Sequence, residues 1–338
     1  MKAAVVENLN EPLVYKDVAI PNIGENEILV KVHACGVCNG DIDAHSGIFP
    51  EFASPVPPRI PGHRSAGEVV EVGAAVTRIK VGDKVGVPLI HDSCGRCQYC
   101  FDGLHMLCAE VRLTGFQADG GYAEYVKANE RYVGLIPDGL DMDQAAHLTC
   151  TGVTAWGALK AADVKAGDWC AIYGLGAVGE YTLQFAKSFG LNVIAISGFD
   201  EALEIAERNG ADLMINSRRD NVAETIQDQI GGAHAVIVNS VKVEPFQLAF
   251  SALRSKGTLV GIGLPMEQLP IPIFEMIVKE ITVRGSFVGS RNDLERSYAT
   301  ALRDNIHIDI EEAPLSDVND VYRQIREGTT TARILLRP

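Results

Sequence analysis

Two patterns of hydrophobic and polar positions divide the chain. In the first third, short alternating runs such as residues 27–36, 67–73 and 83–90 are separated by Gly- and Pro-containing turns, which predicts strands. From about residue 152, apolar runs alternate with segments whose apolar residues recur at helical spacing. This alternation predicts a parallel sheet covered by helices on both faces. The runs expected to form that sheet are residues 169–174, 192–197, 213–217, 233–240 and 257–263. After about residue 285 the pattern is irregular, and it ends in a strand-like segment, 332–338.

Length and charge narrow the class of protein. A chain of 338 residues suggests about two domains. Its formal net charge of -14 repels polyanions, so we expect no nucleic-acid partner. No apolar run approaches the ~18 residues of a membrane span, so we expect no membrane partner either. The N-terminal residues lack the apolar stretch of a signal peptide, and we therefore expect a cytoplasmic protein.

Four of the eight cysteines are closely spaced. They follow the pattern Cys94-x2-Cys97-x2-Cys100-x7-Cys108, and in the reducing cytosol such cysteines are poor candidates for disulfides. Four thiolates complete a tetrahedron around one zinc ion and leave no open position, which predicts a structural zinc. An iron–sulfur cluster is the alternative metal site. Four unrelated buried thiols are not expected at this density.

A second set of metal-binding residue types is scattered along the chain: Cys38, His63 and Cys150. Two thiolates and one imidazole would supply three ligands and leave the fourth position for water or substrate, as in a catalytic zinc site. The spacing alone does not establish this site, because an isolated buried cysteine or histidine more often serves in packing.

A glycine-rich turn directly follows the apolar run 169–173 and opens a segment with helical periodicity. This is the context in which G-x-G-x-x-G predicts dinucleotide binding, although a plain strand–helix turn remains the alternative. The first glycine permits the tight turn, the second lets a pyrophosphate approach, and the third lets the helix pack on the strand. Free N–H groups at the helix N-terminus would bind the phosphates. The motif consists of Gly174, Leu175, Gly176, Ala177, Val178 and Gly179.

From end to end, the chain resembles the zinc-dependent medium-chain alcohol dehydrogenases, most closely their bacterial and yeast-like branch. The matching segments are CGVCNGDID, PGHRSAGEVVEVG, CGRCQYCFDGLHMLC, DGGYAEYV, LTCTGVTAW, YGLGAVGEYTLQFAKSFG and GSFVGSRNDL. The resemblance implies an α/β fold with two domains. Residues 1–151 and 286–338 would form a chaperonin-like, partly open β-barrel catalytic domain with a structural zinc loop at 91–108. Residues 152–285 would form a doubly wound Rossmann domain.

The resemblance also implies a reaction, in which a hydride passes between a nicotinamide dinucleotide and a small alcohol or carbonyl compound. Zinc would act as a Lewis acid on the substrate oxygen. Each subunit would hold two zinc ions, and the protein would be a homo-oligomer, either a dimer or a tetramer. The resemblance implies that Cys38, His63 and Cys150 bind the catalytic zinc and that Asp41 supports the zinc-bound histidine. It also implies that Thr154 and Val178 contact the nicotinamide. Arg333 would lie near the cofactor phosphates.

Two positions depart from the family pattern. Gly40 stands where a Ser or Thr usually begins a proton relay; either a water or the cofactor ribose replaces it, or proton release is altered and reduction is preferred. Arg64 follows His63 where Glu is usual. We expect Arg64 to pair with Asp41 or Asp43, and a surface arginine is the alternative.

These departures keep one enzymatic rival open: a zinc-containing reductase of an activated alkene or iminium, in which the zinc is not catalytic. A non-catalytic zinc module is a second rival, because the four-cysteine loop alone could bind a partner or nucleic acid.

The choice between NAD and NADP depends on the end of the apolar run 192–197. NAD-dependent relatives carry an Asp there, whereas this chain has Ser197, which does not repel a 2′-phosphate. Arg218 and Arg219 lie just after the run 213–217 and could reach that phosphate. Asp200 or Glu201 could instead serve NAD. The pattern therefore favours NADP only slightly.

Overall fold

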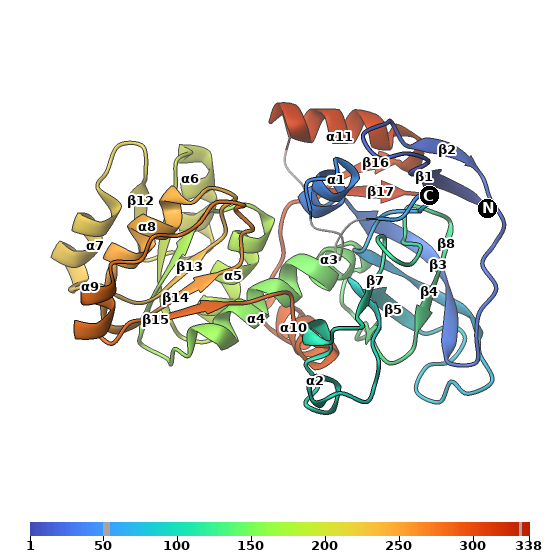
Figure 1. Ribbon diagram of the computed structural model, residues 1–338, viewed down its shortest axis with the longest axis horizontal. Helices are drawn as coiled ribbons and strands as arrows, with labels where there is room; N and C mark the ends of the chain where they lie inside the picture. Colours follow the sequence, from blue (N-terminus) through green and yellow to red (C-terminus); the bar gives the residue numbers. More distant parts are fainter. Residues whose placement is uncertain (50–54, 331–332) are drawn as a thin grey trace. The chain divides into compact units, whose positions relative to one another are not determined.

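The computed structural model describes residues 1–49, 55–330 and 333–338, and the chain folds as two compact units (Figure 1). Unit 1 comprises Met1–Cys150, Ser290–Leu302 and Asp309–Pro338, and unit 2 comprises Thr151–Gly289 and Arg303–Ile308. No helix in the described ranges is long and apolar enough to cross a membrane. The domain boundaries implied by the resemblance remain a prediction.

Unit 2 is built on a six-stranded parallel sheet with the strand order β12-β11-β10-β13-β14-β15. Strand β10, the first strand of this unit along the chain, lies at the centre of the order. The later strands add outward on both sides of it, as in a doubly wound sheet. The strands are β10 (Trp169–Tyr173), β11 (Asn192–Ser197), β12 (Leu213–Asn216), β13 (Ala233–Val238), β14 (Leu253–Gly261) and β15 (Thr282–Gly285). The predicted parallel sheet is confirmed, and each of its five expected runs forms a strand.

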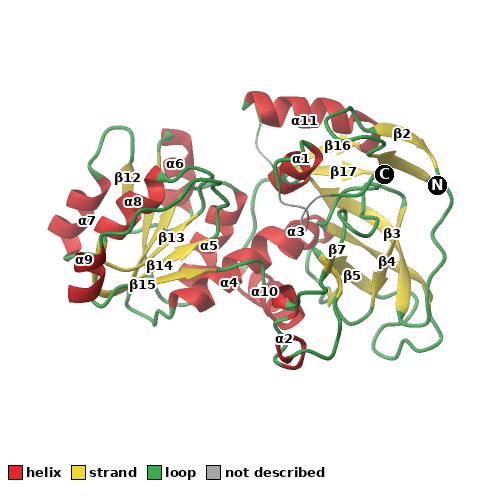
Figure 2. Cartoon of the chain, in the orientation of Figure 1, coloured by secondary structure: helices red, strands yellow, loops and turns green. Residues whose placement is uncertain are grey.

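Helices cover the strands of this sheet (Figure 2). Helix α4 packs against α5, and α7 packs against α8. Local signals set the helix ends: the side chain of Asn221 accepts a hydrogen bond from the backbone N–H of Glu224 at the start of α7, and Gly231 ends that helix at φ +70°. The helices are α4 (Val153–Ala162), α5 (Ala177–Ser188), α6 (Asp200–Arg208), α7 (Val222–Ile230), α8 (Glu244–Ser251) and α9 (Ile273–Val278).

Unit 1 is built on a mainly antiparallel sheet with the order β16-β17-β3-β4-β5-β9, in which β8 also pairs with β3. The long strand β3 supports the rest, since it pairs with β4, β8 and β17. The strands of this sheet are β3 (Glu27–Gly36), β4 (Ser65–Val72), β5 (Lys84–Val87), β8 (Tyr125–Asn129), β9 (Gly134–Leu135), β16 (Glu311–Pro314) and β17 (Ile334–Arg337). Two small two-stranded sheets pair β1 (Lys2–Val5) with β2 (Val14–Asp17) and β6 (Ile90–Asp92) with β7 (Arg112–Leu113).

The irregular pattern expected after residue 285 is wrong, because two helices form there. In α11 the apolar residues Val318, Val321, Tyr322 and Ile325 recur at helical spacing, but the charged residues between them dilute the signal. The α-helices that do not belong to the set packed on the sheet of unit 2 are α1 (Asn39–His45), α2 (Gln98–Phe101), α3 (Met142–His147), α10 (Arg291–Asp304) and α11 (Val318–Glu327).

Each unit has its own hydrophobic core, which holds the strand ends in place. In unit 1, Val30, Val69 and Tyr122 are fully or almost fully buried together. In unit 2, Ile194 and Val236 occupy the equivalent interior of the parallel sheet. Cys38 and His63 flank the strands β3 and β4 at their ends, whereas Cys150 lies between the helices α3 and α4.

Candidate metal centres and cofactor site

Cys38 lies at the junction between β3 and α1. It is the N-cap of α1 with an extended backbone (φ -117°, ψ 139°), and its Sγ accepts a hydrogen bond from the backbone N–H of Gly40 at 3.3 Å. A free N–H group at the start of a helix stabilises negative charge on a neighbouring sulfur. The local fold therefore favours a thiolate at this position.

His63 is positioned by the glycine that precedes it. Gly62 has φ +96°, and a Cβ there would lie 2.5 Å from Cδ1 of Tyr122, so only glycine fits. Nδ1 of His63 donates to Oδ1 of Asp41 at 2.8 Å, and the hydroxyl of Tyr122 donates to Oδ2 of the same carboxylate at 3.2 Å. This arrangement fixes the ring and leaves Nε2 of His63 available as a ligand.

Cys150 lies on a π-helical turn, Leu148–Gly152, between α3 and α4. Such turns insert an extra residue into a helix and are frequent at functional sites. The sequence pattern gave no sign of this turn. It is the feature that directs a cysteine from the end of α3 toward residues more than 80 positions earlier in the chain.

The structure brings Cys38, His63 and Cys150 together. One potential ligand atom from each lies within 4.8 Å of the other two. Zinc takes sulfur ligands at about 2.3 Å and imidazole nitrogen at about 2.0–2.1 Å, which places tetrahedral ligand atoms about 3.5–3.8 Å apart. The 4.8 Å limit accommodates that spacing, and two sulfurs and one nitrogen would leave one position of a tetrahedral zinc ion open.

The two sulfurs of this group influence each other's protonation. The pKa of Cys38 lies well below its ordinary value, chiefly because of a hydrogen bond with Cys150; burial opposes the shift, and the charges of Arg64 and His63 assist it. The same hydrogen bond, together with burial, raises the pKa of Cys150 to about 12. Without a metal one sulfur therefore keeps a proton, whereas zinc binding requires both to lose it.

The expectation that Arg64 pairs with Asp41 or Asp43 is wrong. Its Nη2 donates instead to Sγ of Cys38 at 2.9 Å, and its Nη1 donates to the carbonyl oxygen of Val37 at 3.0 Å. Asp41 is already engaged by His63 and Tyr122. The surface alternative is wrong as well, because Arg64 is only 4% exposed.

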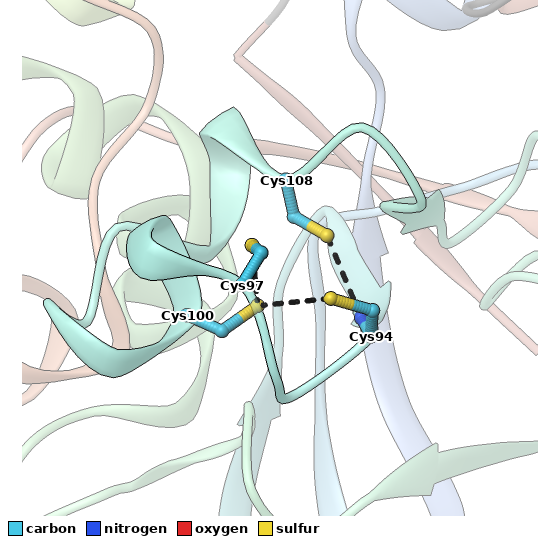
Figure 3. A group of neighbouring side chains, drawn as sticks. All are labelled: Cys94, Cys97, Cys100 and Cys108. Carbon is cyan, nitrogen blue, oxygen red and sulfur yellow. Dashed lines mark hydrogen bonds between the residues drawn. The ribbon is translucent and has the colours of Figure 1, made fainter.

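The second candidate metal centre lies in the loop that carries Cys94, Cys97, Cys100 and Cys108. Their side chains point toward one another (Figure 3). Sγ of Cys100 lies 3.9 Å from Sγ of Cys94 and 3.6 Å from Sγ of Cys97, close to the ~3.8 Å edge of a zinc–sulfur tetrahedron. Backbone N–H groups of Cys94 and Glu110 donate to Sγ of Cys108 at 3.5 and 3.4 Å. Four sulfurs held in this way fit a closed zinc site.

Two of the predicted glycines are required by the protein itself. Gly174 has φ +97°, and a Cβ there would lie 2.5 Å from the carbonyl oxygen of Asn239. A Cβ on Gly179 would lie 2.0 Å from the carbonyl oxygen of Gly174. At Gly176, the N-cap of α5, a Cβ would meet nothing within 4 Å. The backbone is therefore open at that point, as a dinucleotide pyrophosphate requires.

The remaining residues of the glycine-rich turn lie where the motif places them. Leu175 is buried after β10, while Ala177 and Val178 form the half-buried first turn of α5. Thr154 is half-buried in the first turn of α4. These positions belong to unit 2, and their contact with a nicotinamide remains a prediction.

The residues considered for cofactor choice cluster after β11 and β12. Ser197 ends β11, and its hydroxyl oxygen accepts from the backbone N–H of Phe199 at 3.1 Å. The guanidinium of Arg218 lies 4.3 Å from the centre of the exposed Phe199 ring. Arg219 instead pairs with both carboxylate oxygens of Asp200, at 2.8 and 2.6 Å.

Arg333 lies in unit 1, immediately before β17, and its carbonyl oxygen accepts from the backbone N–H of Glu311 at 3.1 Å. Its predicted place near the cofactor phosphates remains a prediction. His147 is fully buried at the end of α3. Burial, assisted by the charge of Arg64, lowers the pKa of His147 to about 3, so this ring is neutral at neutral pH.

Tyr122 is the residue that sequence reasoning missed. It belongs to the segment DGGYAEYV, which supported the resemblance without a role for its tyrosine. Its ring packs where a side chain on Gly62 would lie, and its hydroxyl contacts Asp41. A fully buried tyrosine hydroxyl needs a hydrogen-bond partner, and that general rule was the only signal available.

Comparison with known proteins shows the family. Residues 177–303 match the zinc-binding dehydrogenase family, and residues 24–138 match the alcohol dehydrogenase GroES-like domain. An alcohol dehydrogenase of Geobacillus stearothermophilus is 42% identical over 337 residues, which cover 100% of this chain and 99% of that protein. An alcohol dehydrogenase of Moraxella sp. (strain TAE123) is 40% identical and covers 99% of both chains.

Solved structures of dehydrogenases are similar to this chain over its whole length. The alcohol dehydrogenase of Aeropyrum pernix has a TM-score of 0.90 at 29% identity and covers 100% of both chains. A protein of Sinorhizobium meliloti 1021 described as a zinc-binding dehydrogenase, solved with NADP, also has a TM-score of 0.90 at 29% identity and covers 100% of this chain and 99% of its own.

The chain belongs to the zinc-dependent medium-chain alcohol dehydrogenase family. The resemblance is therefore confirmed, as is the fold class of a GroES-like domain with a Rossmann sheet. The chain is an enzyme, an oxidoreductase of alcohols linked to NAD(P). The second rival hypothesis, a non-catalytic zinc module, is therefore wrong.

A substitution in the four-cysteine loop tests its metal. We expect Cys97→Ser to lower the zinc content by one ion per chain, because three thiolates and a hydroxyl hold zinc weakly. The midpoint of thermal unfolding should fall with it, since binding energy at a structural site contributes to folding. Zinc content is measured by elemental analysis after gel filtration.

The matched control is Cys170→Ser, because Cys170 is a fully buried cysteine of β10 that belongs to neither cluster. It should keep both ions. A Cys97→Ser protein that still holds two zinc ions after gel filtration would contradict the assignment.

Proposed function

We propose that this enzyme transfers a hydride between NADP(H) and a small alcohol or carbonyl compound at a zinc ion held by Cys38, His63 and Cys150. The observation that carries the proposal is the group of three potential ligand atoms within 4.8 Å of one another. Their chemistry leaves one coordination position for substrate. A second zinc ion, held by the four-cysteine loop, would stabilise the fold, which gives two per subunit.

Zinc bound at this site would act as a Lewis acid on the substrate oxygen. The chain's own residues would orient the site. Asp41 holds Nδ1 of His63, so that Nε2 faces the ligand position, and Tyr122 in turn holds Asp41. Gly40 contributes no side chain for proton transfer, so water or a cofactor hydroxyl would have to carry the proton.

The domain roles follow from this assignment. Residues 1–151 and 286–338 would form the catalytic domain, because the side chains of both candidate metal centres belong to the first of these ranges. Residues 152–285 would bind the dinucleotide, because they contain the open backbone at Gly176. Helix α5 begins there and presents its free N–H groups to the pyrophosphate.

A preference for NADP is supported by the contacts after β11 and β12. Ser197 carries no charge that would repel a 2′-phosphate. Asp200, the acidic candidate for binding the ribose of NAD, is engaged by Arg219 and by Asn216. Arg218 stacks on Phe199, two residues after Ser197, and no carboxylate in the described ranges pairs with it. Its guanidinium is therefore free to bind a phosphate.

Homo-oligomer formation is supported by an exposed apolar surface on unit 2. No residue of α9 is buried, and Phe274 is 82% and Ile277 65% exposed. The next element, β15, is an edge strand of the parallel sheet. Unpaired strand edges and large apolar patches are typical of protein interfaces. We propose that a second copy of the chain covers this surface.

The first experiment removes a proposed ligand of the catalytic zinc. We expect Cys150→Ser to lower kcat/KM on a panel of primary, secondary and aromatic alcohols by about 10³-fold, because Lewis-acid stabilisation contributes several kcal/mol. Binding of NADP+, followed by thermal shift, should be unchanged, since the dinucleotide site lies in other residues. Cys170→Ser is the control and should retain activity.

This experiment also separates the rival function. Gly40 and Arg64 are the departures that favour a reductase of activated alkenes or iminium ions with a non-catalytic zinc. If Cys150→Ser keeps full turnover on an activated alkene or iminium substrate and the wild type oxidises no alcohol, the rival is correct and the proposal is wrong.

The second experiment compares the two cofactors. We expect Arg218→Ala to lower kcat/KM for NADP+ by roughly 10- to 100-fold, because a hydrogen bond to a charged group contributes about 1.5–3 kcal/mol. The value for NAD+ should change little. The control is Arg208→Ala, another exposed arginine after β11 that lies at the end of α6. A wild-type preference for NAD+, or equal losses with both cofactors in Arg218→Ala, would refute the proposal.

The third experiment tests the surface of α9. Phe274→Glu combined with Ile277→Glu should convert the oligomer to a smaller species, because two charges per chain would be buried in the interface. Mass is measured by light scattering, and circular dichroism checks the fold. The control, Val81→Glu, changes a residue of unit 1 that is 59% exposed and should keep the wild-type mass. An unchanged mass in the double variant would exclude this interface.

A further inference from the structure

Arg64 is a buried cation with an unusual counter-ion. Its side chain forms no ion pair with a carboxylate in the described ranges, although the residue is only 4% exposed. Its hydrogen bonds go to Sγ of Cys38 at 2.9 Å and to the carbonyl oxygen of Val37 at 3.0 Å. A buried charge without a partner is strongly unfavourable, and the negative charges that stabilise this guanidinium are those of Cys38 first, then Cys150 and Asp41.

The fold holds this guanidinium in place. Arg64 immediately precedes β4, which pairs with β3 through Cys35 and Ser65. The backbone N–H of Gly36 donates to the carbonyl oxygen of Arg64 at 3.0 Å. A Cβ on Gly36 would lie 3.2 Å from both Cβ and Cδ of Arg64, so the absence of a side chain there gives the arginine its room.

Among the proposed ligands of the first metal centre and the charged groups that hydrogen-bond directly to them, the charges balance only when Arg64 is counted. The thiolates of Cys38 and Cys150 and the carboxylate of Asp41 carry three negative charges, and the guanidinium of Arg64 carries one positive charge. The sum is two negative charges, which one divalent cation neutralises. A neutral residue at position 64 would leave the buried site with one excess negative charge.

We propose that Arg64 is a positioning residue that sets the electron-accepting strength of the metal ion by hydrogen bonding to the sulfur of Cys38. The N–H groups of the guanidinium draw electron density from this sulfur and make it a weaker donor to the metal. Asp41 acts in the opposite sense, because it makes the imidazole of His63 a stronger donor. The inference rests on the proposed function, in which Cys38, His63 and Cys150 hold the metal.

Two consequences distinguish this role from a structural one. Without Arg64 the metal would attract the substrate oxygen less, so kcat should fall by about 10- to 100-fold, the usual effect of removing a group that contacts a metal ligand. The same change would leave more negative charge around the metal, which should therefore leave the site more slowly. A residue that only supported the fold would instead release the metal faster when replaced.

The test uses the full chain loaded with ¹¹³Cd²⁺, which gives a separate NMR resonance for each metal centre. Increased donation from sulfur should move the resonance of the centre at Cys38 in Arg64→Gln toward that of the four-cysteine centre. Arg64 contacts none of the four loop cysteines, so their resonance should stay fixed and serves as the internal reference. Arg64→Lys keeps the charge and an N–H donor, and it should restore most of the wild-type position.

The rate of metal loss supplies the second readout. In the presence of excess EDTA, the first-centre resonance should decay about tenfold more slowly in Arg64→Gln than in the wild type, and faster in Asp41→Asn. If Arg64→Gln does not fold, Gly36→Ala replaces it, because the added methyl group would lie 3.2 Å from Cβ and Cδ of Arg64 and forces a small shift of the arginine without removing its charge. That variant should move the first-centre resonance in the same direction.

The outcomes separate this inference from the proposed function. Wild-type protein with no cadmium resonance beyond that of the four-cysteine centre would refute both. A first-centre resonance that does not move in Arg64→Gln and Gly36→Ala would refute the inference about Arg64 alone. Faster metal loss from Arg64→Gln would assign this arginine a structural role.

Discussion

The mutual repulsion of two buried thiolates is the constraint on which the first metal centre depends. Cys38 and Cys150 are close enough to share a hydrogen bond, which lowers the pKa of the first and raises that of the second to about 12. Two full negative charges cannot occupy this interior without a cation. In the proposed site a divalent metal would resolve the conflict, and with His63 as the third ligand it would still have a coordination position for a substrate oxygen.

Much of unit 1 serves to hold these three residues at one point. The N-terminus of α1 stabilises Cys38, the positive φ of Gly62 aims His63, and Asp41 and Tyr122 fix its ring. The guanidinium of Arg64, whose Nη2 donates to Sγ of Cys38 at 2.9 Å, offsets part of the negative charge. In the glycine-rich turn of unit 2 the backbone alone is arranged for the proposed cofactor. Gly174 and Gly179 allow the close packing of strand and helix, and Gly176 leaves room for a pyrophosphate to approach.

Features with a local signal could be predicted from the sequence. The four cysteines fall within one loop, and the glycine-rich turn directly follows its strand, so short-range spacing was sufficient for both. Residue types alone made the trio of Cys38, His63 and Cys150 a candidate, and only the family resemblance assigned it the catalytic zinc, since nothing local links residues so far apart. The partner of Arg64 was wrongly predicted because the choice between a carboxylate and a thiolate depends on three-dimensional contacts. Helix α11 was missed because its apolar positions are sparse among charged residues.

Anomalous diffraction at the zinc absorption edge, from crystals of the enzyme as purified, tests the central claim most directly. The account predicts two peaks per chain. One should lie about 2.3 Å from the sulfurs of Cys38 and Cys150 and about 2.0–2.1 Å from Nε2 of His63. A single peak at the four-cysteine loop, with the sulfurs of Cys38 and Cys150 too far apart to share an ion, would contradict it.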